Sequence, residues 1–154
     1  MQVDFAVLRY QQTLNDDRWI PLGIVAATPF EHGTIVAVVC LQTVEVEGAS
    51  ELAGAILQDI PTVLRKEIEA SCAKFKPGDD FLEILRAGNP WNLHFSVPQK
   101  EDRNADDILD AAMQLFYERV VKSHVPTNGK RVTIPAARRI RPQRIEMYDF
   151  SVSG

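Results

Sequence analysis

The residues most able to bind a charged partner lie near the end of the chain. Ammonium and guanidinium groups pair with carboxylates and phosphates, and the guanidinium presents a planar fork of donors to both. Six of the seventeen Lys and Arg residues fall in one stretch that contains no acidic residue: Lys130, Arg131, Arg138, Arg139, Arg141 and Arg144. This stretch predicts a partner that carries negative charge.

The charge is divided along the chain. Residues 1–125 hold 11 basic and 19 acidic side chains, a net charge of −8, whereas residues 126–154 hold 6 and 2, a net charge of +4; together these give the −4 of the whole chain. Such a division indicates that the basic segment contacts the acidic body of this protein, a second copy, another protein or a polyanion. We favour an acidic protein surface, including the surface of a second copy in a homo-oligomer.

A nucleic acid is the alternative partner. Arg138, Arg139, Arg141 and Arg144 would then contact phosphates, and Tyr148 or the sheet would supply base stacking, because the basic stretch contains no aromatic residue. The sequence pI of about 5.4 counts against this interpretation, since nucleic-acid-binding domains are usually strongly basic.

A second group of polar residues is suited to a site on the face of a sheet. Arg9 and Tyr10 end the first predicted strand, and His94 and Ser96 lie on one side of a later strand. A histidine near hydroxyl groups and an arginine is a combination that general acid–base catalysis uses. A solvated sheet face explains the same polar row, and we favour that explanation.

The other reactive side chains have structural explanations. Cys40 and Cys72 lack metal-ligand spacing and fit buried thiols. Three pairs of neighbouring aspartates lie at predicted turns or helix starts, where carboxylates cap helices: Asp16-Asp17, Asp79-Asp80 and Asp106-Asp107. We therefore predict no catalytic residue, no metal and no cofactor.

Alternating and continuous apolar stretches predict four strands, at residues 3–10, 19–27, 34–44 and 91–97. The first three are joined by short turns and predict an antiparallel meander, whose second strand ends where Thr28-Pro29 interrupts it. In the fourth strand, Trp91, Leu93, Phe95 and Val97 form the apolar face.

Helical spacing of apolar residues predicts the elements between and after these strands. Ser50 caps a first helix, Pro61 begins a second, and Asp79 caps a short third helix that runs to Arg86. Asp102 or Asn104 starts the last helix. The stretches 131–134 and 145–152 have strand-like composition, which suggests that the end of the chain docks on the body or on a partner.

These elements predict an α+β domain in which a mostly antiparallel, four-to-five-stranded sheet is covered by helices, with a basic C-terminal extension. We assign residues 1–125 to the domain and residues 126–154 to the basic segment. The longest apolar run, Ile35–Leu41, is far shorter than the roughly 20 residues of a membrane helix. Since the first residues do not resemble a signal peptide either, we expect a cytoplasmic protein without a membrane partner.

Two pairs of motifs resemble the bacterial DUF3037 family. Phe5–Tyr10 is followed by Ile20–Val25, and Leu93–Pro98 is followed by Leu115–Val121. The family shows an aromatic strand ending in Arg-Tyr, a strand with a central glycine, a Phe-Ser-x-Pro strand end and a helix with Leu-Phe. Order and spacing agree over most of residues 1–125, but Pro21 replaces a common Asn and the basic segment lies outside the pattern.

The resemblance implies a compact α+β domain of a family without an assigned activity, and it marks Arg9, Tyr10 and Gly23 as the positions that carry over. Because family members are often encoded beside a HipA-like kinase, it also implies an accessory protein of a bacterial stress, toxin–antitoxin or defence module. Gly23 within a strand predicts a bulge or a close backbone approach. Arg9 is expected to pair with a carboxylate, or else to bind an anion.

The sequence therefore predicts a non-enzymatic protein-interaction domain that presents its basic C-terminal segment to an acidic partner. A nucleic-acid-binding accessory protein is the alternative. An enzyme with a site around Arg9, Tyr10, His94 and Ser96 is a weaker one.

Overall fold

A computed structural model of the 154-residue chain describes residues 1–11, 19–30, 33–44, 51–76, 78–88, 93–122 and 147–149. In these residues the chain forms one antiparallel sheet in the order β4–β1–β2–β3–β6, with β5 also paired to β1. The strands are β1 (Gln2–Gln11), β2 (Trp19–Phe30), β3 (Gly33–Cys40), β4 (Leu93–Phe95), β5 (Gln99–Asp102) and β6 (Met147–Asp149).

The first three strands form the predicted meander and the centre of the sheet. Val36 to Leu41 are all buried, as expected of a continuous apolar run covered on both faces. The predicted end of the second strand at Thr28-Pro29 is wrong, because Pro29 pairs with Thr34 and the strand continues to Phe30. The register with β1 ends at Ala27, so Pro29 lies where its missing N–H interrupts no pairing with β1.

Strands β4 and β5 lie one after the other along the free edge of β1. Leu8 pairs with Phe95 and Phe5 pairs with Gln99, so one extra residue is accommodated between the two short ladders. The predicted alternation to Val97 is therefore wrong: β4 ends at Phe95 and the Val97 side chain is 58% exposed. Strand β5 was not predicted, because Gln-Lys-Glu-Asp has no apolar alternation.

The helices are α1 (Glu51–Gln58), α2 (Ile60–Lys74), α3 (Phe81–Ala87) and α4 (Ile108–Phe116), followed by a π-helical turn, η1 (Tyr117–Val121). Pro61 lies in the first turn of α2, as predicted. Two predicted caps are wrong: the Asp80 carboxylate, not that of Asp79, accepts from Leu82 N, and Asp107 caps α4 in place of Asp102 or Asn104.

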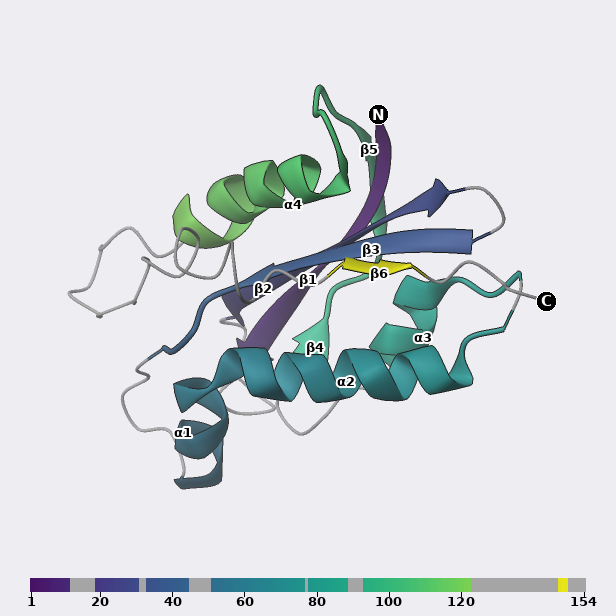
Figure 1. Cartoon of the computed structure of the whole chain (residues 1–154). Coiled ribbons are helices and arrows are strands. Elements are labelled where there is room, and N and C mark those ends of the chain that lie inside the picture. The colour runs from purple at the N-terminus through teal and green to yellow at the C-terminus, as the bar shows by residue number, and fades with distance from the viewer. Residues whose placement is uncertain are drawn as a thin grey trace.

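Helices cover both faces of the sheet. Figure 1 shows α4 on one side of the strands and α1 to α3 on the other. The buried core joins Phe5 and Ile24 of the sheet to Leu115 of α4 and Leu64 of α2. The predicted α+β class, with an antiparallel sheet covered by helices, is confirmed. No helix of the described ranges has the length and apolar character needed to cross a membrane.

The end of the chain returns to the sheet at one described place. The backbone of Met147–Asp149 pairs with Ile35 to Ala37 of β3, which makes β6 the neighbour of β3 on the side opposite β2. Ser50, which we expected to cap α1, and the basic stretch from Lys130 to Arg144 lie outside the described residues.

Candidate functional site

Three side chains from three strands meet at one end of the sheet, and we call them the Arg9 cluster: Arg9 of β1, Trp19 of β2 and His94 of β4. Arg9 lies directly opposite His94 in the β1–β4 ladder, and Trp19 lies opposite Gln11, two residues further along β1. Cross-strand and diagonal neighbours on one face are close enough for large side chains to touch. The pairing of the strands therefore positions the cluster.

The guanidinium of Arg9 is stacked on an aromatic ring. Its central carbon lies 4.5 Å from the centre of the Trp19 ring, which is the geometry of a cation–π contact. The His94 ring meets Trp19 edge to face, with ring centres 5.3 Å apart and an interplanar angle of 87°. The indole thus holds both neighbours in defined orientations.

Arg9 is a cation without an anion in the described structure. Burial lowers the pKa of its guanidinium, because removal from water disfavours the charged form. The Nε atom is buried and has no hydrogen-bond partner, and no carboxylate of the described residues forms an ion pair with Arg9. The expected pairing with a carboxylate is therefore absent from this part of the chain, and the cluster has the donors needed to bind an oxyanion from elsewhere.

The predicted sheet-face site is only partly assembled. Arg9 and His94 are brought together, whereas Tyr10 points to the opposite face because neighbouring strand residues alternate. Tyr10 is buried, and burial raises the pKa of its phenol. Ser96 belongs to the backbone ladder: its Oγ accepts from Val7 N at 2.8 Å, and its own N donates to Val7 O at 2.8 Å.

Gly23 supports the cluster from within β2. An added Cβ would lie 2.8 Å from Cys40 Cβ and 3.0 Å from Val39 O, so the predicted close backbone approach is confirmed. On the other side of β2, the register with β1 skips Leu22 between Gly23 and Pro21. The skipped residue forms a β-bulge, in agreement with the bulge predicted for Gly23. The bulge lies beside Arg9 and bends β2 locally at that point.

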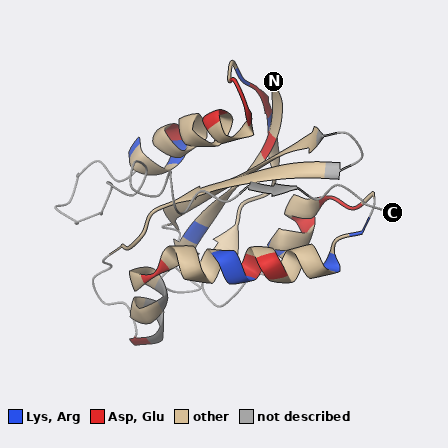
Figure 2. Ribbon diagram, viewed as in Figure 1, with Lys and Arg blue, Asp and Glu red and all other residues tan. Residues whose placement is uncertain are grey.

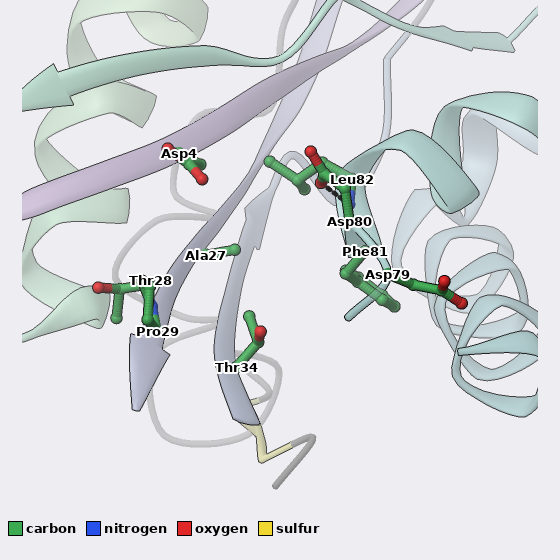
Figure 3. A pocket seen from close by; sticks show the side chains of 9 residues that line it. All are labelled: Asp4, Ala27, Thr28, Pro29, Thr34, Asp79, Asp80, Phe81 and Leu82. Atoms are coloured by element: carbon green, nitrogen blue, oxygen red, sulfur yellow. Dashed lines mark hydrogen bonds between the residues drawn. The ribbon is translucent and has the colours of Figure 1, made fainter. Parts of the chain in front are cut away.

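A pocket lies at the end of the sheet opposite to the Arg9 cluster, where Asp4 pairs with Ala27. Figure 3 shows the side chains that line it. It is a cavity of about 110 Å³ lined by Asp4, Asp79, Asp80, residues of the β2–β3 end and the start of α3. Asp80 already caps α3, and the Asp79 carboxylate accepts from Lys76 N at 3.0 Å. Burial raises the pKa of Asp4, with Asp80 adding to the rise and Lys100 opposing it.

Two of the three carboxylates at this cavity are therefore committed to backbone N–H groups. Across the described ranges, no three His, Cys, Asp or Glu side chains gather closely enough to hold a metal ion. Neither of the two cysteines is a good nucleophile. Cys40 is buried, and burial raises the pKa of Cys72 to about 11. A thiol with such a pKa carries little thiolate at neutral pH.

The predicted polyanion-binding residues lie outside the described residues, apart from Tyr148, of which the structure describes only the backbone pairing with Val36. Sequence reasoning identified Arg9 and His94 but missed Trp19 as a site residue. A signal existed, because the predicted turn between the first two strands brings the start of the second beside the end of the first. Comparison with family models, curated proteins and solved structures finds no match to this chain.

Proposed function

We propose that this chain is a non-enzymatic accessory domain that binds an acidic protein partner. The observation that carries the proposal is the Arg9 cluster: a half-buried arginine stacked on a tryptophan, with a buried Nε that lacks a partner. Arginine and tryptophan are the residues that most often dominate binding energy in protein interfaces. The missing anion is then supplied by the partner.

The basic segment supports the same proposal from the sequence. Its six cations between Lys130 and Arg144 would add long-range attraction to an acidic surface and raise the association rate. The resemblance to the DUF3037 family suggests where such a partner would come from, namely a bacterial stress, toxin–antitoxin or defence module with a HipA-like kinase. A cytoplasmic location fits that setting.

A nucleic acid is the second candidate partner, favoured by the basic segment and by the Arg–Trp stack. Figure 2 shows acidic residues, coloured red on the ribbon, in the helices on both sides of the sheet, and residues 1–125 carry a net charge of −8. This body repels an extended polyanion. We therefore rank nucleic acid below an acidic protein.

The test is capture of partners from native lysate by the full-length protein, with and without nuclease, followed by mass spectrometry. Three variants are compared: Arg9→Gln, a quadruple Arg→Gln variant at residues 138, 139, 141 and 144, and the control Arg86→Gln, whose arginine lies on α3 beside Glu83. We expect a nuclease-resistant protein that Arg9→Gln and the quadruple variant each recover at least about fivefold less.

The control distinguishes the loss of a binding residue from a general effect of replacing an arginine. Arg86→Gln should recover the partner as the unmodified protein does. Recovery of nuclease-sensitive nucleic acid in place of a protein would move the second candidate into first position. Equal recovery of one protein by all variants would contradict the binding roles proposed for Arg9 and for the basic segment.

A further inference from the structure

We infer that the Arg9 cluster is a binding site for a single carboxylate of an acidic peptide, received by the guanidinium of Arg9, with His94 beside it. This inference rests on the proposed function and names the chemistry of the partner at this site. Nothing in the comparisons assigns a ligand to these residues.

The first step in the argument is the Nε atom. A buried N–H without an acceptor destabilises the folded protein, so such groups are rare and usually mark a missing partner. The Arg9 Nε is the one buried side-chain nitrogen or oxygen of the described residues that lacks a partner. A carboxylate bound to the guanidinium would supply the negative charge that this group lacks among the described residues.

The second step is the orientation of the guanidinium. The Trp19 ring stacks on it at 4.5 Å, which fixes the plane of the group. A ligand must then approach in that plane, where the N–H groups point. Carboxylates are planar and accept two parallel hydrogen bonds from such an edge, so the stack preorganises Arg9 for a carboxylate.

The third step is the position of His94. It lies directly across from Arg9 on β4, and its ring packs edge-on against the same indole. Directly opposed residues in a ladder have Cβ atoms about 5 Å apart. The imidazole therefore lies on the same face of the sheet as the Arg9 guanidinium and forms one side of the cluster.

The fourth step separates one carboxylate from a chain of phosphates. Nucleic acids are bound through several cations at once. Three other arginines of the described body, Arg86, Arg103 and Arg119, form ion pairs with glutamates. Among the described residues Arg9 has no such carboxylate partner, so its charge is available to a ligand, and on an acidic body this suits one carboxylate of a peptide better than a polyanion.

The test is an NMR titration of the ¹⁵N-labelled full-length protein with N-acetylglutamic acid α-amide, which carries one carboxylate. We expect the Arg9 Hε–Nε signal to move and saturate at about millimolar ligand, as befits a contact with a single residue of a peptide. The neutral N-acetylglutaminamide should leave the signal in place, and the Arg86 signal should not respond to either compound.

Two variants make the test specific. Arg9→Lys keeps the positive charge but loses the planar guanidinium and its contact with the Trp19 ring. It should weaken binding of the glutamate compound about fivefold or more. Because this variant has no Arg9 Nε signal, its titration is followed by the backbone amides of β1 and β4. Arg86→Lys is the matched control and should bind as the unmodified protein does. Thermal melting of both variants confirms that they fold.

Several results would overturn the inference. Equal binding by Arg9→Lys, an equal response to the glutamine compound, or tighter binding of inorganic phosphate or oligothymidylate than of the glutamate compound would each do so. The Arg9 signal of the unmodified protein could fail to respond to the glutamate compound while Arg9→Gln still captures the protein partner. That pair of results would reject the carboxylate site but not the proposed function. If the unmodified protein captures no protein partner and its Arg9 signal does not respond to the glutamate compound, the proposed function is rejected as well.

Discussion

At Arg9 the guanidinium lies against an indole ring instead of a carboxylate. The contact replaces water on one side of the group but leaves the Nε atom without an acceptor. Structural arginines of this protein behave differently: Arg103 donates to Glu101, Glu118 and Gln114. This contrast within one chain is the residue-level reason to treat Arg9 as a binding residue.

Gly23 is predicted to tolerate no side chain. A Cβ at this position would lie 2.8 Å from Cys40 Cβ and 3.0 Å from Val39 O, and because β3 is a central strand it cannot move away freely. Gly23→Ala should lower the free energy of unfolding by about 1–3 kcal/mol, measured by urea denaturation.

Gly54 provides the matched control. It lies in α1 and has no atom within 4 Å of an added Cβ. Gly54→Ala should therefore stabilise the protein by up to about 1 kcal/mol, because alanine has the higher helix propensity. If Gly23→Ala proved as harmless as Gly54→Ala, the tight packing of β2 against β3 would be disproved.

Ser96 is predicted to be structural, not catalytic. Its hydroxyl is the acceptor for Val7 N, and Ser96→Ala leaves that partly buried N–H unpaired, which should cost about 1–3 kcal/mol in the free energy of unfolding. Thr28→Val, which removes an exposed hydroxyl that donates to Gln2 O, is the control and should have a much smaller effect. Loss of partner binding without loss of stability in Ser96→Ala would contradict this assignment.

Asp4 is predicted to make stability depend on pH. Its pKa is raised in the folded protein from the ordinary 3.8, mainly by burial. The folded state therefore holds this proton more tightly, and the resulting stabilisation is complete below the unfolded pKa and is lost as pH rises through the folded pKa. Asp4→Asn should raise the melting temperature at pH 7, with the gain shrinking towards pH 3.

The control for Asp4 is Glu69→Gln, which removes an exposed carboxylate from α2. This variant should show a smaller change in melting temperature that does not follow the same pH course. A melting temperature of Asp4→Asn that falls at pH 7 would show that attraction to Lys100 outweighs burial.

The site was predictable from the sequence to the extent that its residues carry unusual chemistry. Arg9 and His94 stand out as polar residues of otherwise apolar strands. Trp19 does not, because a tryptophan at the start of a strand has an ordinary role in a core. Its place beside Arg9 depends on the hairpin register, in which Gln11 pairs with Trp19, and register depends on the turn and on the β2 bulge.

At the scale of the elements, β5 is attached to the last helix by charged side chains. Arg103, 14% exposed, bridges Glu101 and Glu118, and Arg119 reaches the same Glu101 at 2.8 Å. The carbon of the Arg119 guanidinium also lies 5.5 Å from the centre of the Phe5 ring. These contacts join an edge strand without apolar alternation to α4 and η1.

Arg103→Met is predicted to loosen this attachment. Because Arg103 is mostly buried, its loss leaves Glu118 without its partner and Glu101 with Arg119 alone, and it should lower the free energy of unfolding by about 1–3 kcal/mol. Arg86→Met removes an exposed ion pair, with 3.5 Å between the arginine and Glu83, and should change it by less than about 1 kcal/mol. Urea denaturation compares the two; equal effects would show that the network contributes no more than a surface pair.

Elements with a strong local pattern were predicted, and elements that depend on distant partners were not. The three-stranded meander, the break between α1 and α2, and α3 follow from apolar spacing, proline and glycine. Strand β5 consists of four polar residues and is a strand because β1 offers its free edge. Asp102 does not cap α4 for the same reason, since β5 includes Asp102, and α4 begins at Ile108 with Asp107 as its cap.

At the scale of the whole molecule, the charge asymmetry decides how salt should affect binding. A carboxylate at the Arg9 cluster involves one or two charge pairs, so the logarithm of the affinity should fall with a slope of about one against the logarithm of salt concentration. A nucleic acid that neutralises several phosphates would fall several times more steeply. Titrations of N-acetylglutamic acid α-amide and of an oligothymidylate at about 50 to 200 mM salt separate the two, and an equally steep slope for both compounds would contradict a single-carboxylate site.

The position of β1 in the sheet has a consequence for synthesis on the ribosome. Gln2 pairs with Asp102 and Leu8 with Phe95, so one edge of β1 waits for partners that are translated about ninety to a hundred residues later. Until then the nascent meander exposes one long backbone edge of β1. The pairing of β4 and β5 with β1 is a slow step because the partners are far apart in the sequence. An exposed strand edge can meanwhile pair with other chains. β5, whose polar sequence does not predict a strand, is thus the last segment to pair with β1, and it ends this exposure.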